Sequence, residues 1–161
     1  GRRLIFMKKI LYIMVGIVII CVITGLLVAN AGYHRIDSGE GTIYGRLTKR
    51  DKDKVVVLVA GSGPTDMNGN SGTYDKRNDS LLMLSKELGR EGISVFRYDK
   101  RTSGKSKNTF DITQIEFDDF VKDCTQVIRY LKDYGFDKVY IAGHSQGNQL
   151  YGINTIKSNQ M

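Results

Sequence analysis

The 161-residue sequence is poor in cysteine and histidine, with two of each, and it has one proline and no tryptophan. Cys21 falls in a long apolar run and Cys124 in an expected helix far along the chain, so the pair does not indicate a disulfide. Cys124 is expected to be a small buried apolar residue. The histidines His34 and His144 are the whole supply of imidazole bases in the sequence. No internal repeat is visible, and the length fits about one domain.

The positive charge of the chain is concentrated at its start. The formal net charge is +7 at pH 7, and residues 1–9 contribute four basic residues and no acidic one. The rest of the sequence has no basic stripe interleaved with aromatic residues, which is typical of nucleic-acid-binding surfaces. We therefore interpret most of the excess charge as a topology signal, and nucleic acid is not expected as a partner.

A run of 20 uncharged residues, from Ile10 to Ala29, follows this basic leader. A helix of that length is about 30 Å long, which matches the hydrocarbon core of a bilayer. The run predicts a membrane helix over residues 10–30, with the leader 1–9 in the cytoplasm and the rest of the chain outside. A cleaved signal stays open, because Ala29 and Ala31 form an Ala-x-Ala-like site. The length of the run favours an uncleaved anchor.

Four segments of the remaining sequence are expected to be strands: 42–48, 55–60, 93–98 and 138–142. The first alternates apolar and polar residues, which is typical of a half-buried strand. The second is continuous and β-branched, which is typical of a strand covered on both faces. Residues 31–40 are polar and contain glycine, so we expect a linker there and a domain over 41–161.

Two amphipathic helices are expected between the last three strands. Apolar residues recur at helical spacing over 81–88, and Gly92 follows them as a C-terminal cap. Thr113 and Glu116 have capping-box spacing and are expected to open the second helix. Strands that alternate with helices predict an α/β fold, a mainly parallel sheet with helices on both faces.

The sequence GHSQG, residues 143–147, directly follows the last expected strand. It fits the Gly-x-Ser-x-Gly elbow, in which a sharp strand-to-helix turn lifts a serine hydroxyl above the sheet edge. Gly143 and Gly147 leave room for that strained turn. Ser145 is therefore the expected nucleophile, and the N–H of Gln146 is an expected oxyanion donor. A structural glycine-rich turn is the alternative.

A second glycine-containing segment, AGSGP at residues 60–64, follows the β-branched strand. In a parallel sheet the end of that strand lies near the elbow. Glycines let the backbone turn and expose N–H groups to an oxyanion. Ser62, or next Gly63, is the expected second donor, and an ordinary Gly-Pro turn is the alternative.

Nucleotide binding is a rival that the sequence disfavours. RTSGKS, residues 101–106, ends like a phosphate-binding loop, but that motif needs a glycine at the position of Asp99 and a helix that begins at once. GSGPTD likewise fails the Gly-x-Gly-x-x-Gly pattern at Asp66.

Three motifs together resemble the α/β-hydrolases, close to the bacterial esterases and serine-aminopeptidase-like hydrolases: AGSGPTD, FRYDKRTSGKS and IAGHSQG. The resemblance covers about residues 41–147. It implies an α/β-hydrolase fold, a Ser–acid–His triad, no metal or organic cofactor, and an ester substrate, with an amide or peptide second. Asp99 precedes the serine, so it is expected to be a structural turn residue.

The sequence departs from that family after Ser145. Residues 146–161 contain no Asp, Glu or His, so the acid and base of the triad cannot come from them. His34 is expected to be a polar linker residue, and His144 a packing residue whose side chain leaves the backbone away from the serine. We therefore expect the N-terminal half of a membrane-anchored hydrolase. The alternative is an inert tethered fragment or interaction module.

Overall fold

The computed structural model describes residues 2–30, 32–71 and 77–143 of the chain. They fall into two compact units, which divide after Gly32. The first unit is the helix α1 (Arg2–Asn30), and the second is a sheet domain that begins at Tyr33.

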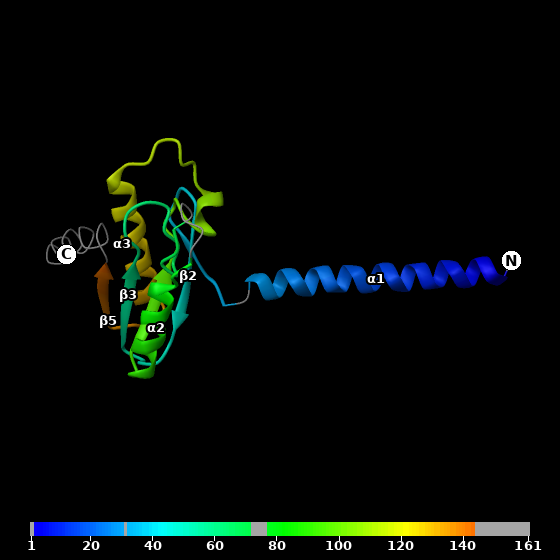
Figure 1. Cartoon of the computed structure of the whole chain (residues 1–161), viewed down its shortest axis with the longest axis horizontal. Helices are drawn as coiled ribbons and strands as arrows, with labels where there is room; N and C mark the ends of the chain where they lie inside the picture. The colour runs from blue at the N-terminus through cyan, green and yellow to red at the C-terminus, as the bar shows by residue number, and fades with distance from the viewer. Residues whose placement is uncertain (1, 31, 72–76, 144–161) are drawn as a thin grey trace. The chain divides into compact units, whose positions relative to one another are not determined.

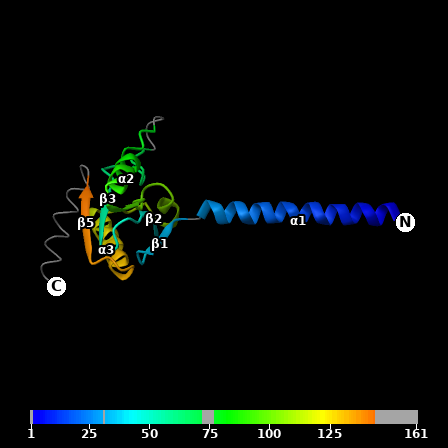
Figure 2. The same cartoon turned by 90° about the horizontal axis from the view of Figure 1, so that it is seen from below.

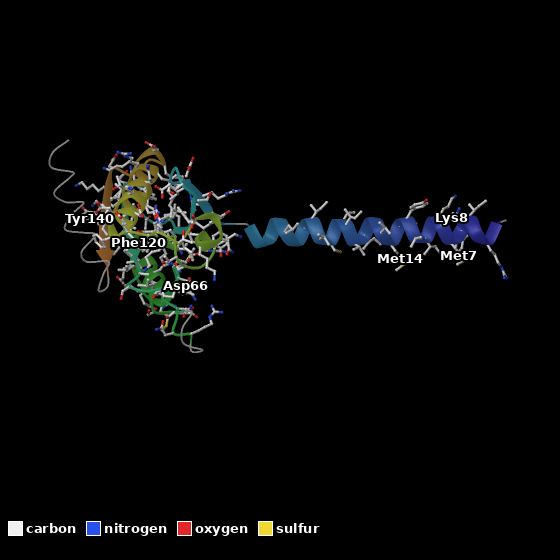
Figure 3. All side chains as sticks on the ribbon, turned by 90° about the horizontal axis from the view of Figure 1, so that it is seen from above. Met7, Lys8, Met14, Asp66, Phe120 and Tyr140 are labelled. Carbon is white, nitrogen blue, oxygen red and sulfur yellow. The ribbon has the colours of Figure 1, made fainter. Side chains whose placement is uncertain are left out.

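The helix α1 is apolar along most of its length. Its segment Ile5–Leu26 has a mean hydropathy of 2.5, and none of its residues is buried. Figure 3 shows side chains projecting from all sides of this helix, Met7 and Met14 among them. The helix begins earlier than the expected 10–30, at Arg2. It is long and apolar enough to span a membrane or to act as a signal sequence.

The sheet domain is built on five strands in the order β1-β2-β4-β3-β5, of which Figure 1 labels β2, β3 and β5. They are β1 (His34–Asp37), β2 (Thr42–Thr48), β3 (Lys54–Val59), β4 (Ser94–Tyr98) and β5 (Lys138–Gly143). β3 pairs in parallel with both β4 and β5, whereas β2 runs antiparallel to its two neighbours. All strands except β2 therefore run in one direction, which confirms the mainly parallel sheet.

Helices cover both faces of the sheet, as expected. They are α2 (Ser80–Arg90) and α3 (Phe117–Asp133), with a short 3-10 helix, η1 (Ser106–Thr109), between them. Figure 2 shows α2 and α3 on opposite sides of the strands. Gly92 follows α2 with a φ of 79°, and the N–H of Ile93 donates to the carbonyl of Leu88 at 2.9 Å. These contacts confirm Gly92 as the C-terminal cap.

The expected capping box of the second helix is wrong by three residues. α3 begins at Phe117, and the N–H of Glu116 donates to the carboxylate of Asp119 at 3.0 Å. Thr113 instead donates its N–H and its hydroxyl to Asp111. Glu116 therefore takes the N-cap position, and Asp119 takes the capping-box position three residues later. Thr113 does not cap the helix, because it is hydrogen-bonded in a local turn.

The hydrophobic core lies between α3 and the sheet. Val127 and Leu131 of α3 are fully buried there, with Val57 of β3 and Phe96 of β4. Cys124 also has no exposed surface, which confirms its expected place in the core. The continuous apolar run of β3 is buried because strands pair on both of its sides and helices cover both faces of the sheet.

Two expectations for the sheet need correction. Residues 34–37 of the expected linker form β1, which pairs with β2. The sheet is expected to have helices on both faces, but one face of its last strand, β5, is exposed, because Tyr140 is 51% exposed and Ala142 is exposed as well. Among the described residues β5 pairs only with β3, and α2 packs against β2 and β4. One face of β5 therefore stays open in this part of the chain.

Candidate functional site

The strands β3, β4 and β5 end at one edge of the sheet, which we call the carboxyl edge. Val59, the last residue of β3, pairs with Gly143, the last residue of β5. The loop after β3 therefore starts beside the segment that follows β5. Gly143 ends its strand, as the elbow motif requires. The rest of the elbow lies outside the described residues: His144, Ser145, Gln146 and Gly147.

The loop after β3, residues 60–71, carries the expected oxyanion donors. Ser62 and Gly63 are exposed at its tip. Gly63 has a φ of 74°, which glycine adopts at little cost. The hydroxyl of Thr65 donates to the carbonyl of Ser62 at 3.2 Å and tightens the turn. The structure thus places Ser62 and Gly63 in a tight turn at the carboxyl edge, and their role as donors stays a prediction.

A cavity of about 520 Å³ opens beside this loop. It is lined by Gly61, Ser62, Thr65 and Gly69 from the loop, by Asn78 just before α2, and by Ser80, Leu81 and Leu84 from α2. The two leucines give it an apolar wall next to the candidate donors. A cavity with this mixture of apolar surface and a few polar groups suits a small organic ligand.

Side chains from β4 and the turn after it hold this loop in place. Asp99 is 3% exposed, and its carboxylate accepts one hydrogen bond from the N–H of Met67 and one from the N–H of Lys105, both at 2.8 Å. Burial raises the pKa of Asp99. A Cβ at Gly104 would lie 2.1 Å from this carboxylate, so the turn needs glycine there. These contacts give Asp99 the expected structural role.

A second charged residue from this turn, Lys100, also reaches the loop after β3. Its ammonium donates to the carbonyls of Gly61 and Gly63, the latter at 2.9 Å. Burial lowers the pKa of Lys100 to about 8. Sequence reasoning missed this residue. The available signal was a run of three charged residues placed directly after a buried strand.

The next residue, Arg101, ties the same turn to α3. Its guanidinium donates to both carboxylate oxygens of Asp123 at 2.8 Å and to Glu40 at 2.9 Å. Arg101 and Asp123 are both almost fully buried, so the pair holds because each charge satisfies the other. The turn that carries Asp99 and Lys100 is therefore fixed on its far side as well.

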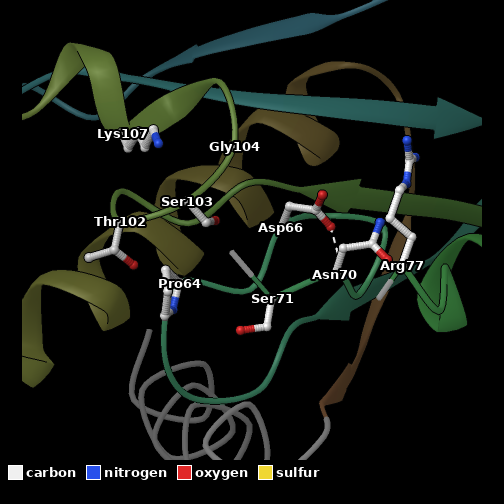
Figure 4. Close-up of a pocket in the computed structure, with 9 residues that line it drawn as sticks. All are labelled: Pro64, Asp66, Asn70, Ser71, Arg77, Thr102, Ser103, Gly104 and Lys107. Atoms are coloured by element: carbon white, nitrogen blue, oxygen red, sulfur yellow. Dashed lines mark hydrogen bonds between the residues drawn. The ribbon is translucent and has the colours of Figure 1, made fainter. Parts of the chain in front are cut away.

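A second cavity, of about 380 Å³, lies between the two loops of the carboxyl edge (Figure 4). It is lined by Pro64, Asp66, Asn70, Ser71, Arg77, Thr102, Ser103, Gly104 and Lys107. Most of these side chains are polar, and Arg77 and Lys107 bring positive charge. Asp66 accepts the N–H of Asn70 at 2.9 Å, which closes the loop on itself. The cavity therefore offers hydrogen-bonding side chains from both loops.

The upstream histidine is a packing residue of the sheet domain. His34 lies on β1, and its Nδ1 is 2.7 Å from the hydroxyl of Tyr130 on α3. Its ring also meets the rings of Phe96 and Tyr134 edge to face. Burial lowers the pKa of His34. The expectation of a linker residue is therefore wrong, because His34 packs against a helix that begins 83 positions later in the chain.

Comparison with known proteins gives a consistent result. The family described as "Serine aminopeptidase, S33" matches residues 68–151, about half of the chain. The esterase EstD of Thermotoga maritima is 33% identical over 96 residues, which cover 59% of this chain and 22% of the esterase. The chain therefore spans about a fifth of the length of that relative.

Solved structures share the fold at low sequence identity. A serine hydrolase homologue from Coxiella burnetii has a TM-score of 0.57 at 15% identity, over 79% of this chain and 58% of the other. An esterase from Pyrococcus furiosus has a TM-score of 0.56 at 19% identity, over 74% of this chain and 41% of the other. Because the matched regions cover 58% and 41% of these two solved chains, both chains are longer than the matched region.

Proposed function

This chain belongs to the serine aminopeptidase S33 family of α/β-hydrolases, and we propose that it supplies the nucleophile half of a serine esterase. The observation that carries the proposal is the parallel pairing of Val59 with Gly143. It sets the loop of Ser62 beside the first residue of the GHSQG motif, as a nucleophile elbow and its oxyanion loop require. The esterase relative favours an ester substrate, with an amide or peptide second.

The proposed reaction is acyl transfer to water. The Oγ of Ser145 attacks the carbonyl carbon while its proton passes to a base, and the carbonyl oxygen becomes an oxyanion. The N–H groups of Ser62 and Gln146, or of Gly63, donate to that oxygen. Collapse of the tetrahedral intermediate releases the alcohol with a proton from the base. Water then attacks the Ser145 ester, releases the acid and restores the serine.

The base and the acid of the triad are proposed to come from a part of the protein outside this sequence. Residues 146–161 contain no Asp, Glu or His, and His34 is packed against Tyr130. A serine hydroxyl without a base is a poor nucleophile at neutral pH. Residues 1–161 alone are therefore expected to be nearly inert, and an inert tethered module is the second candidate function.

The apolar helix α1 bears on where in the cell this reaction takes place. We propose that α1 anchors the chain in the membrane with the sheet domain on the extracytoplasmic side, because the basic residues lie before the helix. Release after Ala31 is the alternative. A reporter that is active only outside the cytoplasm, fused after residue 161, is expected to give signal in the membrane fraction. Signal in the medium would favour cleavage, and a cytoplasmic reporter would contradict the topology.

The test of the reaction compares three proteins that also carry the coding sequence found downstream of residue 161. They are the unchanged protein, Ser145→Ala and, as a matched control, Ser38→Ala in the β1–β2 turn. With short-chain nitrophenyl esters, Ser145→Ala is expected to lower kcat by about 10³-fold or more, and Ser38→Ala to leave it unchanged. A fluorophosphonate is expected to label Ser145 alone.

Two results would contradict the proposal. Turnover that survives in Ser145→Ala would mean that another residue is the nucleophile. If no ester or amide is turned over and the fluorophosphonate does not react, the inert module becomes the better description. Both results are independent of α1, because the readout is chemistry at the sheet domain.

A further inference from the structure

Among the described residues, the ammonium of Lys100 is buried against backbone carbonyls rather than against an acid. The residue is 3% exposed and follows β4 directly. Its Nζ donates to the carbonyls of Gly61 and Gly63 and lies 5.7 Å from the ring centroid of Phe120. A lysine rarely gives up water without a specific partner, because burial disfavours its charged form. Its partners here are the two glycines that flank Ser62.

Peptide geometry connects these contacts to the candidate oxyanion donor. The carbonyl of Gly61 and the N–H of Ser62 belong to one planar peptide, and no cis peptide is present among the described residues. In a trans peptide these two groups point in opposite directions. A carbonyl held toward Lys100 therefore turns the Ser62 N–H away from Lys100.

The strand order relates the direction of the Ser62 N–H to the neighbouring strands. β3 lies between β4 and β5 in the sheet. Lys100 follows β4, the loop of Ser62 follows β3, and the elbow motif follows β5. The Gly61 carbonyl faces the ammonium of a residue that follows β4, so a Ser62 N–H that points the opposite way can face the segment after β5. The contact of Lys100 with the Gly63 carbonyl orients no N–H group, because the next residue is Pro64, which has no N–H. It fixes the turn only.

We propose that Lys100 is a positioning residue that orients the Ser62 N–H toward the oxyanion by holding the carbonyls of Gly61 and Gly63. The proposal rests on the proposed function, because it takes the segment after β5 as the nucleophile. Lys100 touches neither substrate nor nucleophile in this role. At the tip of the loop, Gly63 has a positive φ, and no atom of the described residues lies within 4 Å of a Cβ position there, so packing by this part of the chain does not replace the clamp.

The expected consequence of losing the Lys100 contacts is weaker stabilisation of the transition state. Removal of one oxyanion donor lowers kcat by about 10²–10³-fold in serine hydrolases. A donor that is loosened rather than removed is expected to lower kcat by about 10–100-fold. KM is expected to change by less than about threefold, because the oxyanion forms only after substrate has bound.

The test uses Lys100→Met, which keeps the length of the side chain and removes its donors. Lys100→Arg keeps donors, and Lys52→Met is the control, an 88% exposed lysine in the turn before β3. Hydrogen exchange of residues 61–66 is measured in the full chain in detergent micelles. Exchange is expected to rise about tenfold or more in Lys100→Met, less in Lys100→Arg and not at all in Lys52→Met. The separate effects on kcat and KM are measured in the protein that also carries the downstream sequence.

The two proposals fail in different ways. If Ser145→Ala abolishes turnover while Lys100→Met changes neither loop exchange nor kcat, the clamp is wrong and the hydrolase stands. If loop exchange rises in Lys100→Met but turnover does not depend on Ser145, the loop contact stands and the catalytic role falls. A rise in KM as large as the fall in kcat in Lys100→Met would also overturn the positioning role.

Global unfolding of Lys100→Met would show as faster exchange in β3 and β4 as well. In that case the clamp is tested by an NMR pH titration of the unchanged protein. The carbonyl ¹³C shifts of Gly61 and Gly63 are expected to titrate together with the ¹³Cε shift of Lys100. Carbonyl shifts that stay constant while Lys100 titrates would overturn the clamp.

Discussion

The helix α1 and the sheet domain contain the same apolar residue types in opposite surroundings. Ile13 of α1 is 62% exposed, whereas Ile43 of β2 has no exposed surface. In the domain, apolar burial stabilises the fold by about 25 cal/mol per Å² removed from water. α1 leaves its apolar surface open on every side, so it gains nothing comparable from its own fold. In the proposed membrane location, lipid covers the apolar surface of α1, whereas the apolar residues of the domain are buried in its own core.

Charge follows the same division. The window Ile5–Leu26 of α1 has only two charged residues, Lys8 and Lys9, both near its start. The domain buries Arg97, Lys100 and Arg101, each with hydrogen-bond partners. A buried charge is tolerated where such partners exist and is costly where they do not. The contrast between the two parts can thus be tested with apolar and with charged substitutions.

The largest expected effect is the loss of an aromatic ring in the domain. Phe96→Ala opens the centre of the core between β4 and α3 and is expected to lower the free energy of unfolding by about 3–5 kcal/mol. Tyr12→Ala removes a ring that is 73% exposed on α1 and is expected to change the same quantity by less than about 0.5 kcal/mol. Urea unfolding of the domain in detergent micelles measures both. Equal effects would break the contrast.

The second substitution breaks the best-buried ion pair of the domain. Asp123→Ala leaves the guanidinium of Arg101 with Glu40 and with longer contacts to Asp119, and it is expected to destabilise the domain by about 3 kcal/mol. Asp53→Ala is the control, because its contact with Lys52 is exposed and 3.9 Å long. The control is expected to cost less than about 1 kcal/mol in the same denaturation experiment. Removal of Arg101 together with Asp123 should recover part of the loss.

Most of the sheet domain could be predicted from local sequence patterns. The buried run 55–60 and the alternating run 42–48 match β3 and β2 within one residue. The glycine after α2 was also found, because a cap depends on a few neighbouring residues. β1 was missed because four residues of mixed polarity carry no period. Its strand state depends on pairing with β2 and on His34 meeting Tyr130 of α3.

The candidate site shows the same limit. The elbow glycines and the AGSGP segment are visible in sequence because each follows an apolar strand. The role of Lys100 was not visible, because nothing local indicates that its ammonium reaches carbonyls that precede it by 39 and 37 positions. The capping of α3 failed for a related reason, since Thr113 and Asp119 offer equivalent spacing from Glu116 and only the folded turn decides between them.

The third substitution places a charge without a partner in α1. Ile17→Lys puts an ammonium near the middle of the apolar window, where insertion is expected to become less favourable by about 2.5–3.5 kcal/mol. The fraction of chain that withstands carbonate extraction from membranes is therefore expected to fall. Ile17→Leu is the matched control and should behave as the unchanged chain. Full retention of Ile17→Lys would contradict the role of α1 as a membrane-spanning helix.

The smallest expected effect concerns the lysine that the domain already buries. Burial lowers the pKa of Lys100 in the folded protein to about 8, from its ordinary 10.5. Below pH 8 both states are protonated. Between pH 8 and 10.5 the unfolded chain binds more protons than the folded one, so the free energy of unfolding rises with pH.

This rise is expected to be about 1–2 kcal/mol, less than the full shift would give, because solvent screening reduces its effect on stability. Lys100→Met has no proton to lose, so its unfolding midpoint in urea should lack this rise. The tyrosines titrate in both proteins, and the difference between the two curves removes their contribution. The Lys52→Met control should follow the unchanged chain across the range. A difference curve that is flat from pH 7.5 to 10.5 would mean that the Lys100 ammonium stays in water, and the contrast between a buried and an exposed lysine would fail.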